Sequence, residues 1–286
     1  CSSDLNGKTT RLADTWEYDI DNDWWTQRAD MPGTVRNAAT GFPVGNKGYI
    51  TTGYNPDQKY LADTWEYDPE TNTWRQMDDF KGGARYYALG FGIDNYGYVG
   101  TGYNDNYLKD FYRFDPTAAA GSQWTIVNGF GGQKRQGATA FVINGKAYVC
   151  GGQNNNSDVS DFWRFDPSAA TPWTQLRDIA NTSDDDYDDD YTSIVRSYGV
   201  SFVIDGKAYL TLGSTAGGSY YSNYWIYDPE TDLWEGDDLT AFEGSTRIHA
   251  VCFSTGTRGI IATGGSGSSS YFDDTWELKP YEYEEE

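Results

Sequence analysis

The chain has 286 residues, a formal net charge of −22 and an aromatic content of 17%, including 24 tyrosines. A charge this negative argues against nucleic acid as a partner, because its phosphates would be repelled. No run of 18 apolar residues occurs in the sequence, so we expect no transmembrane helix. The length is compatible with one all-β domain.

Cys1 opens the chain and is followed by Ser2, Ser3 and Asp4. This start resembles that of a mature bacterial lipoprotein, and together with the acidic, aromatic-rich body it is similar to surface lipoproteins of Bacteroidetes. The resemblance implies an acylated Cys1, a tether over residues 1–11 and a location on the cell surface at the outer membrane. More than one acyl chain would hold such a protein stably on a membrane. The alternative is that a cysteine stands first by chance.

One aromatic strand–turn–strand pattern recurs along the chain. In its clearest copy, residues 64–67 (TWEY) predict a strand, residues 68–72 (DPETN) predict a turn, and Trp74 lies on the returning strand. Asp14, Asp63, Asp110 and Asp161 open successive copies, 49, 47 and 51 residues apart. The copies are residues 13–25, 61–74, 110–124, 161–173, 223–234 and, shortened, 273–280.

A second half-unit lies between these copies and begins each time with an arginine. Its five copies are residues 36–54, 85–103, 135–153, 196–214 and 247–265. Each predicts an apolar strand, a turn and a second strand that ends in small residues. Asn144-Gly145 and Asp205-Gly206 are strong hairpin signals, because a type I′ turn needs positive φ at both central positions.

The repeat resembles the kelch family from about Leu12 to the end of the chain. The resemblance is carried by paired small residues (Gly151-Gly152 and Gly264-Gly265), by the aromatics that precede them (Tyr49, Tyr98, Tyr148 and Tyr209) and by the spaced tryptophans. Thr52-Gly53, Thr101-Gly102 and Leu212-Gly213 depart from the double glycine but keep one glycine each.

The resemblance implies an all-β, kelch-type β-propeller in one domain over residues 12–286. The period near 50 residues agrees with this. Six copies of the aromatic pattern but five arginine-led hairpins favour six blades of four antiparallel strands with an incomplete first blade. Residues 281–283 are a possible fourth strand of the last one. Five blades are the alternative.

The five arginines that lead the hairpins are the first candidate ligand-binding residues. Each precedes the innermost strand of a blade, so by symmetry we expect a ring around one mouth of the central channel. In kelch domains that bind acidic peptides, arginines at this place contact carboxylates, and a guanidinium suits that role. The alternative is structural: each arginine bridges to an aspartate of a neighbouring blade or to strand-end carbonyls. The five residues are Arg36, Arg85, Arg135, Arg196 and Arg247.

Two further groups are candidates. Tyr54, Tyr103, Tyr220 and Tyr221 follow second strands, where they could grip a glycan or peptide, although each could equally pack against a neighbouring loop. An insertion before Arg196 contains Asp184, Asp186, Asp188 and Asp190, which offer oxygen ligands to calcium. It lacks the glycine of an EF-hand loop, and runs of like charge are usually solvated, so no cofactor is expected apart from this weak calcium candidate.

Catalysis has little support in the sequence. His249 is the only histidine, so zinc and copper sites lack ligands and a catalytic triad lacks a supporting motif. We therefore expect a non-catalytic, surface-exposed binding or scaffold lipoprotein. Its expected partner is an outer-membrane assembly of a barrel and other lipoproteins, such as a nutrient-uptake complex. The alternatives are a module that binds glycans or acidic peptides, and a sugar mutarotase or epimerase, because a sialic acid epimerase family also uses kelch propellers.

Overall fold

The computed structural model describes residues 11–236, 240–267 and 270–280. The chain divides into two compact units, Cys1–Asn128 and Gly129–Glu286. Among the described residues, regular structure is β-strand apart from the short 3₁₀ turn η1 (Asp186–Asp188). None of these residues forms a helix of the length and hydropathy that a membrane span requires.

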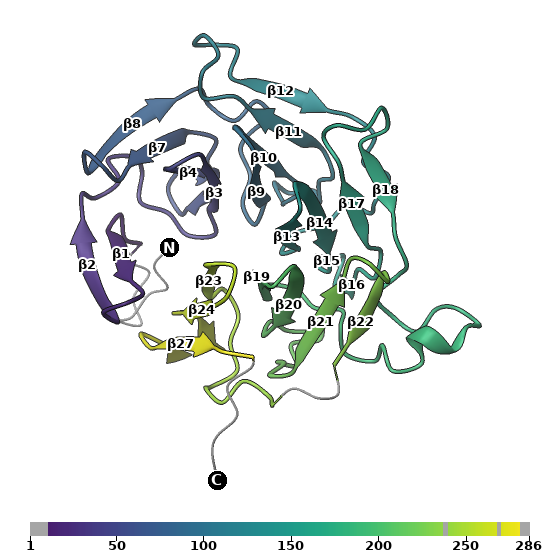
Figure 1. The fold of residues 1–286 in the computed structure, drawn as a ribbon. Helices are drawn as coiled ribbons and strands as arrows, with labels where there is room; N and C mark the ends of the chain where they lie inside the picture. Colours follow the sequence, from purple (N-terminus) through teal and green to yellow (C-terminus); the bar gives the residue numbers. More distant parts are fainter. Residues whose placement is uncertain (1–10, 237–239, 268–269, 281–286) are drawn as a thin grey trace. The chain divides into compact units, whose positions relative to one another are not determined.

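Unit 1 has one two-stranded sheet, two four-stranded sheets and one short two-stranded ribbon, all antiparallel (Figure 1). The first sheet pairs β1 (Thr15–Asp19) with β2 (Trp24–Arg28). The second sheet contains β3 (Thr40–Val44), β4 (Lys47–Thr51), β7 (Thr64–Asp68) and β8 (Thr73–Met77). The third contains β9 (Leu89–Ile93), β10 (Tyr96–Gly100), β11 (Phe111–Phe114) and β12 (Trp124–Val127). A short ribbon of β5 (Tyr54–Asn55) and β6 (Lys59–Tyr60) connects β4 to β7.

Unit 2 has two four-stranded sheets and one three-stranded sheet, all antiparallel. The first contains β13 (Thr139–Ile143), β14 (Lys146–Cys150), β17 (Trp163–Phe165) and β18 (Trp173–Gln175). The second contains β19 (Val200–Ile204), β20 (Lys207–Thr211), β21 (Tyr224–Asp228) and β22 (Leu233–Glu235). The third contains β23 (Val251–Ser254), β24 (Gly259–Ala262) and β27 (Thr275–Leu278). Two ribbons complete the unit, β15 (Gln153–Asn154) with β16 (Ser157–Asp158) and β25 (Gly265–Ser266) with β26 (Ser270–Tyr271).

The predicted hairpins are confirmed. Asn144 and Gly145 have φ of 50° and 72°, and Asp205 and Gly206 have 49° and 79°. Positive φ at both residues is what a two-residue type I′ turn requires, and Asn, Asp and Gly accept it most easily. The apolar strands on either side of these turns begin their blades.

The fold class is confirmed as all-β with propeller blades of four antiparallel strands. Within the described residues, five sheets begin with an arginine-led hairpin, which matches the five-blade alternative and corrects the preference for six. The β1–β2 pair is a sheet of its own. Its Trp25 is 36% exposed, whereas the equivalent Trp124 and Trp234 of complete blades are 2% and 5% exposed. Within the described residues no inner hairpin pairs with β1 to cover this tryptophan. The possible fourth strand at 281–283 lies outside the described residues.

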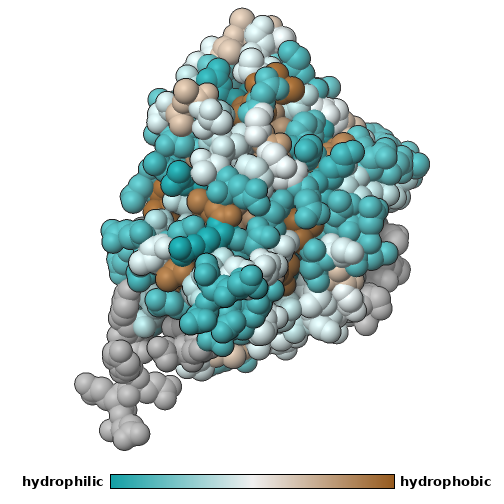
Figure 2. Space-filling model, turned by 90° about the vertical axis from the view of Figure 1, so that its right-hand side faces the viewer, coloured by the Kyte–Doolittle hydropathy of each residue, from teal (hydrophilic) through white to brown (hydrophobic). Residues whose placement is uncertain are grey.

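Each unit has an aromatic core. In unit 1 the core contains Phe42, Val44, Tyr49, Phe80, Val99, Phe114 and Trp124. In unit 2 the insertion of residues 176–195 contributes Ile179, Tyr191 and Ile194 to the core, and the Tyr191 hydroxyl accepts a hydrogen bond from the Trp234 amide at 2.7 Å. Figure 2 shows one side of the molecule, where hydrophilic residues predominate and hydrophobic ones form small separate patches.

Candidate functional site

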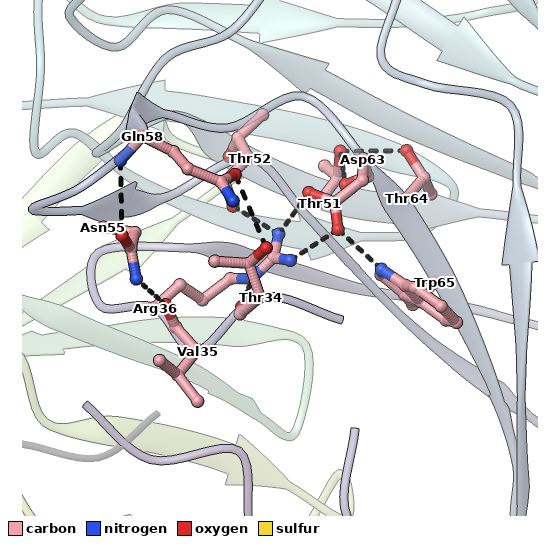
Figure 3. Close-up of polar contacts among 10 residues, drawn as sticks. All are labelled: Thr34, Val35, Arg36, Thr51, Thr52, Asn55, Gln58, Asp63, Thr64 and Trp65. Atoms are coloured by element: carbon pink, nitrogen blue, oxygen red, sulfur yellow. Dashed lines mark hydrogen bonds and ion pairs between the residues drawn. The ribbon is translucent and has the colours of Figure 1, made fainter. Parts of the chain in front are cut away.

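Arg36 shows how the repeated arginines are held (Figure 3). Its Nη1 and Nη2 donate to the two carboxylate oxygens of Asp63 at 2.8 and 2.5 Å. Nε donates to the Thr34 carbonyl at 2.9 Å, and Nη1 also donates to the Thr52 carbonyl at 3.0 Å. Asp63 accepts a further bond from Trp65 Nε1 at 2.6 Å. Asp63 directly precedes β7 of the same blade, so the arginine links the start of the hairpin to its end and to the third strand. We call this arrangement the arginine clamp.

The clamp recurs in all five blades. Each arginine donates from Nε to the carbonyl two residues before it and from Nη1 to the carbonyl sixteen residues after it. The side-chain acceptors are Asp63, Asp110, Asp161, Asn223 and Asp274. All five arginines are only 0–3% exposed. The structure therefore gives these arginines the contacts of the structural alternative, to strand-end carbonyls, with a side-chain partner in the same blade and not in a neighbouring one. A ligand-binding role stays a prediction for Arg36, Arg85, Arg135, Arg196 and Arg247.

The fourth blade, which contains β19 to β22, has a different side-chain acceptor for its arginine. Asn223 replaces the aspartate and accepts from Arg196 Nη2 at 3.1 Å. Burial lowers the pKa of Arg196 to about 10, because no carboxylate offsets the cost of desolvating the charge. Among the five clamp arginines, Arg196 therefore has the buried charge that its partners compensate least.

The departures from the double glycine follow from the clamp. Thr52, Thr101, Gly151, Leu212 and Thr263 supply the sixteenth carbonyl, and each has a positive φ between 57° and 64°. The next residue is always glycine. At Gly152 a Cβ would lie 2.7 Å from the Gln136 carbonyl oxygen, a contact that backbone atoms cannot relieve. The second position is therefore glycine in every blade. The first position accepts a side chain in four blades but not at Gly151, where a Cβ would lie 2.3 Å from the Arg196 carbonyl oxygen. In the last blade the pair is Thr263-Gly264, not Gly264-Gly265.

Unit 1 gathers six tyrosines, all partly exposed, which we call the tyrosine cluster: Tyr54, Tyr60, Tyr86, Tyr87, Tyr103 and Tyr107. Tyr86 is its hub. Its ring centroid lies 5.7 Å from Tyr54, 5.6 Å from Tyr60, 4.7 Å from Tyr87 and 5.7 Å from Tyr103. The Tyr60 and Tyr86 rings are nearly parallel, at 6°, and Tyr107 contacts Tyr103 at 5.0 Å.

The backbone holds these rings in place. Tyr54 and Tyr60 face each other across the β5–β6 ribbon. Tyr86 follows the clamp residue Arg85 and forms a backbone bridge with Tyr103, which in turn bridges to Tyr107. The cluster is thus assembled on segments that the clamps and ribbons already fix.

Charged groups border the cluster. The Tyr60 hydroxyl donates to the exposed Asp105 carboxylate at 2.7 Å. Partial burial, together with this bond, raises the pKa of Tyr60 to about 12, so the phenol stays neutral in the physiological range. The Arg11 guanidinium carbon lies 5.4 Å from the Tyr54 ring centroid, and Arg11 Nε donates to Asn37 Oδ1 at 3.1 Å.

Two of the four predicted aromatics, Tyr54 and Tyr103, belong to the cluster. The other two lie in unit 2. The Tyr221 ring stacks under the Arg196 guanidinium at 4.7 Å, and the Tyr220 hydroxyl accepts from the Gly267 amide at 2.8 Å. Sequence reasoning missed Tyr60, Tyr86, Tyr87 and Tyr107. The available signal was the pair of tyrosines directly after Arg85, where the other copies have Asn-Ala, Gln-Gly, Ser-Tyr and Ile-His.

Unit 2 has different side chains at the equivalent positions. Gln136 and Gln153 both donate from Nε2 to the Tyr198 hydroxyl at 2.8 Å. The Tyr198 ring centroid lies 4.5 Å from that of His249. Amides therefore occupy the places where unit 1 has Tyr86 and Tyr103, so the two units present different chemistry.

The aspartate insertion is built around one buried carboxylate. Asp188 Oδ2 accepts from the Thr182 and Ser183 amides at 2.9 Å, and Oδ1 accepts from the Ser183 hydroxyl at 2.9 Å. Asp184, Asp186 and Asp190 are exposed. Among the described residues no three His, Cys, Asp or Glu side chains come together as a metal site, so the structure does not assemble the four predicted calcium ligands. Cys1 lies outside the described residues.

Comparison with known proteins supports the assignment of the repeats and of the fold. The Kelch motif family matches residues 43–81 and 134–176. N-acetylneuraminate epimerases of Yersinia pestis and Yersinia pseudotuberculosis are 29% identical over 164 residues, which is 47% of this chain and 41% of theirs. The chain therefore matches less than half the length of these relatives.

A solved structure titled "Structure of YjhT" superposes with a TM-score of 0.74 at 14% sequence identity, over 93% of this chain and 89% of that one. At this identity the likeness concerns the fold alone. Together with the arginine-led, four-stranded sheets, these comparisons support a kelch-repeat β-propeller as the fold of this chain.

Proposed function

We propose that this protein is a non-catalytic binding protein that docks onto its partner through the tyrosine cluster. A kelch propeller fits a binding or scaffold role, although a fold alone does not assign one. In finer terms, the protein is an accessory subunit of an outer-membrane assembly such as a nutrient-uptake complex, tethered at the cell surface by an acylated Cys1.

The tyrosine cluster carries the proposal. Its six rings are partly exposed and already packed against one another. Tyrosine combines a large apolar area with a polar tip and is enriched at binding hot spots. Because the rings are ordered before binding, docking loses little side-chain entropy. The arginines, in contrast, are buried in their clamps.

The test is a gentle detergent extraction of the tagged, membrane-anchored protein, followed by mass spectrometry of what is recovered with it. We expect stoichiometric recovery of an outer-membrane barrel and its lipoproteins. Tyr60→Ala should lose this partner, and Tyr60→Phe, which keeps the ring, should retain it. Recovery of the wild-type propeller alone would overturn the accessory role.

A sugar epimerase or mutarotase is the second candidate. The observation that favours it is the 29% identity to N-acetylneuraminate epimerases. An anionic sugar would need cationic or donor groups other than the five clamp arginines, since these are internal. Proton NMR of the α and β anomers of N-acetylneuraminate, which are epimers at C2, tests this candidate: accelerated interconversion with added protein supports it, and an unchanged rate removes it.

A further inference from the structure

Arg11 occupies a two-part seat on unit 1. One part is the face of the Tyr54 ring, 5.4 Å from the guanidinium carbon to the ring centroid. The other is Asn37 Oδ1, which accepts from Arg11 Nε at 3.1 Å. An aromatic face and a coplanar acceptor are the two features that recognise a guanidinium.

The seat is made by the fold and not by Arg11. Asn37 and Tyr54 exchange backbone hydrogen bonds at 3.1 and 2.8 Å. Asn37 directly follows the clamp residue Arg36, and Tyr54 directly follows the required glycine, Gly53. The clamp of Arg36 therefore holds both Asn37 and Tyr54 in place, whichever cation occupies the seat.

Arg11 is held differently from the clamp arginines. It is partly exposed, whereas the clamp arginines are only 0–3% exposed. A cation over a partly exposed ring gains only about a two- to five-fold preference from that contact. A guanidinium of the partner can therefore compete with Arg11 for the Tyr54 ring.

A second position for a cation lies beside the first. The Tyr60 ring centroid is 6.3 Å from that of Tyr54, and the exposed Asp105 carboxylate accepts from the Tyr60 hydroxyl. A carboxylate next to an aromatic face can pair with a guanidinium in bidentate geometry while the ring stacks on it. Exposed Asp57 and Lys59, on the same ribbon, offset each other in charge. The net charge of −22 attracts a basic partner from a distance.

Resting on the proposed function, we infer that the tyrosine cluster recognises arginine side chains of the protein partner. One guanidinium takes the Tyr54–Asn37 seat in place of Arg11, and a second pairs with the Asp105 carboxylate beside the Tyr60 ring. Arg11 acts as an internal competitor that the partner displaces. Lysine fits less well, because a compact ammonium neither stacks on a ring as a plane nor pairs in a fork.

The direct test uses the full-length protein and a labelled Gly-Arg-Gly-Arg-Gly peptide, with its lysine counterpart as control, in a fluorescence-anisotropy titration. We expect the arginine peptide to bind at least about five-fold more tightly than the lysine peptide. Arg11→Ala should tighten binding about two- to five-fold by vacating the seat. Tyr54→Ala and Asp105→Asn should each weaken it, and Tyr220→Ala, outside the cluster, should leave it unchanged. Equal affinity for both peptides, or no effect of Arg11→Ala, overturns the inference.

A second measurement separates the inference from the function on which it rests. The recovered complex is washed with excess free arginine or, at the same ionic strength, with lysine. Release by arginine alone supports the inference. A partner that depends on the Tyr60 ring but is not released by arginine overturns the inference and leaves the docking function standing.

Discussion

Arg135→Met tests the arginine clamp most directly. Arg135 is 0% exposed and donates to the Gln133 and Gly151 carbonyls, each at 3.1 Å, and to the Asp161 carboxylate. Methionine fills much of the same volume but makes none of these bonds. Two carbonyls lose their charged donor, and a carboxylate that is 10% exposed loses its partner.

The magnitude follows from those losses. Removing one member of a buried ion pair costs about 3–5 kcal/mol, because the other charge stays buried without compensation. We expect the free energy of unfolding to fall by about this amount. Lys146→Met, in the same blade, is the matched control. Its ion pair with Asp166 is formed by a side chain that is 39% exposed, and such surface pairs contribute about 0–1 kcal/mol.

Urea unfolding followed by tryptophan fluorescence measures both variants against the wild type. A lower midpoint with an unchanged slope reports a loss of stability. The clamp interpretation is refuted if Arg135→Met costs no more than Lys146→Met. It is also refuted if Arg135→Met leaves the midpoint unchanged but abolishes partner recovery, since Arg135 would then be a ligand-binding residue after all.

Three further predictions follow from the same contacts. Asn223→Asp should raise the free energy of unfolding by about 1 kcal/mol in a urea titration, because it gives Arg196 a charged acceptor; a lower stability would contradict this. Gly152→Ala should lower the melting temperature more than Gly145→Ala, because both have positive φ but only Gly152 has a carbonyl within reach of a new Cβ. Equal losses would show that φ alone matters. The hydrogen bond from its clamp arginine lowers the pKa of Asp274 below its ordinary 3.8, so this pair stabilises the fold fully above that value and the contribution disappears as the pH falls through the lower, folded value. Asp274→Asn should therefore flatten the stability–pH curve below pH 3.8, and an unchanged curve would exclude the pair as a source of acid sensitivity.

The repeat and the strand pattern were predictable because they are local. The Asn144-Gly145 turn and the alternation in the flanking strands depend on a few neighbouring residues. The clamp was predicted only in part: the structural alternative named strand-end carbonyls as acceptors but placed the aspartate in a neighbouring blade. Arg135 and Asp161 each stand out as repeated landmarks, but their pairing depends on whether the arginine side chain turns into its own blade or out of it. Sequence spacing alone does not decide that.

The tyrosine cluster was found in part for a similar reason. Tyr54 and Tyr103 lie after second strands, where a loop is expected. Tyr86 follows a buried arginine and sits next to Tyr103 only through a backbone bridge. The chemistry of a cluster assembled from separate turns depends on such long-range contacts, which a periodic pattern does not contain.

The constant separation of sixteen residues within every clamp has a consequence for how this chain can change in length. One guanidinium holds both ends of each hairpin, so the length of the hairpin is fixed: one added residue would carry the bonded carbonyl out of reach. Insertions are therefore tolerated only outside these hairpins, and the long segment at 176–195 lies before Arg196, between an outer strand and the next hairpin. Loops engineered into this protein should be placed in the outer connections, where no arginine fixes the number of residues.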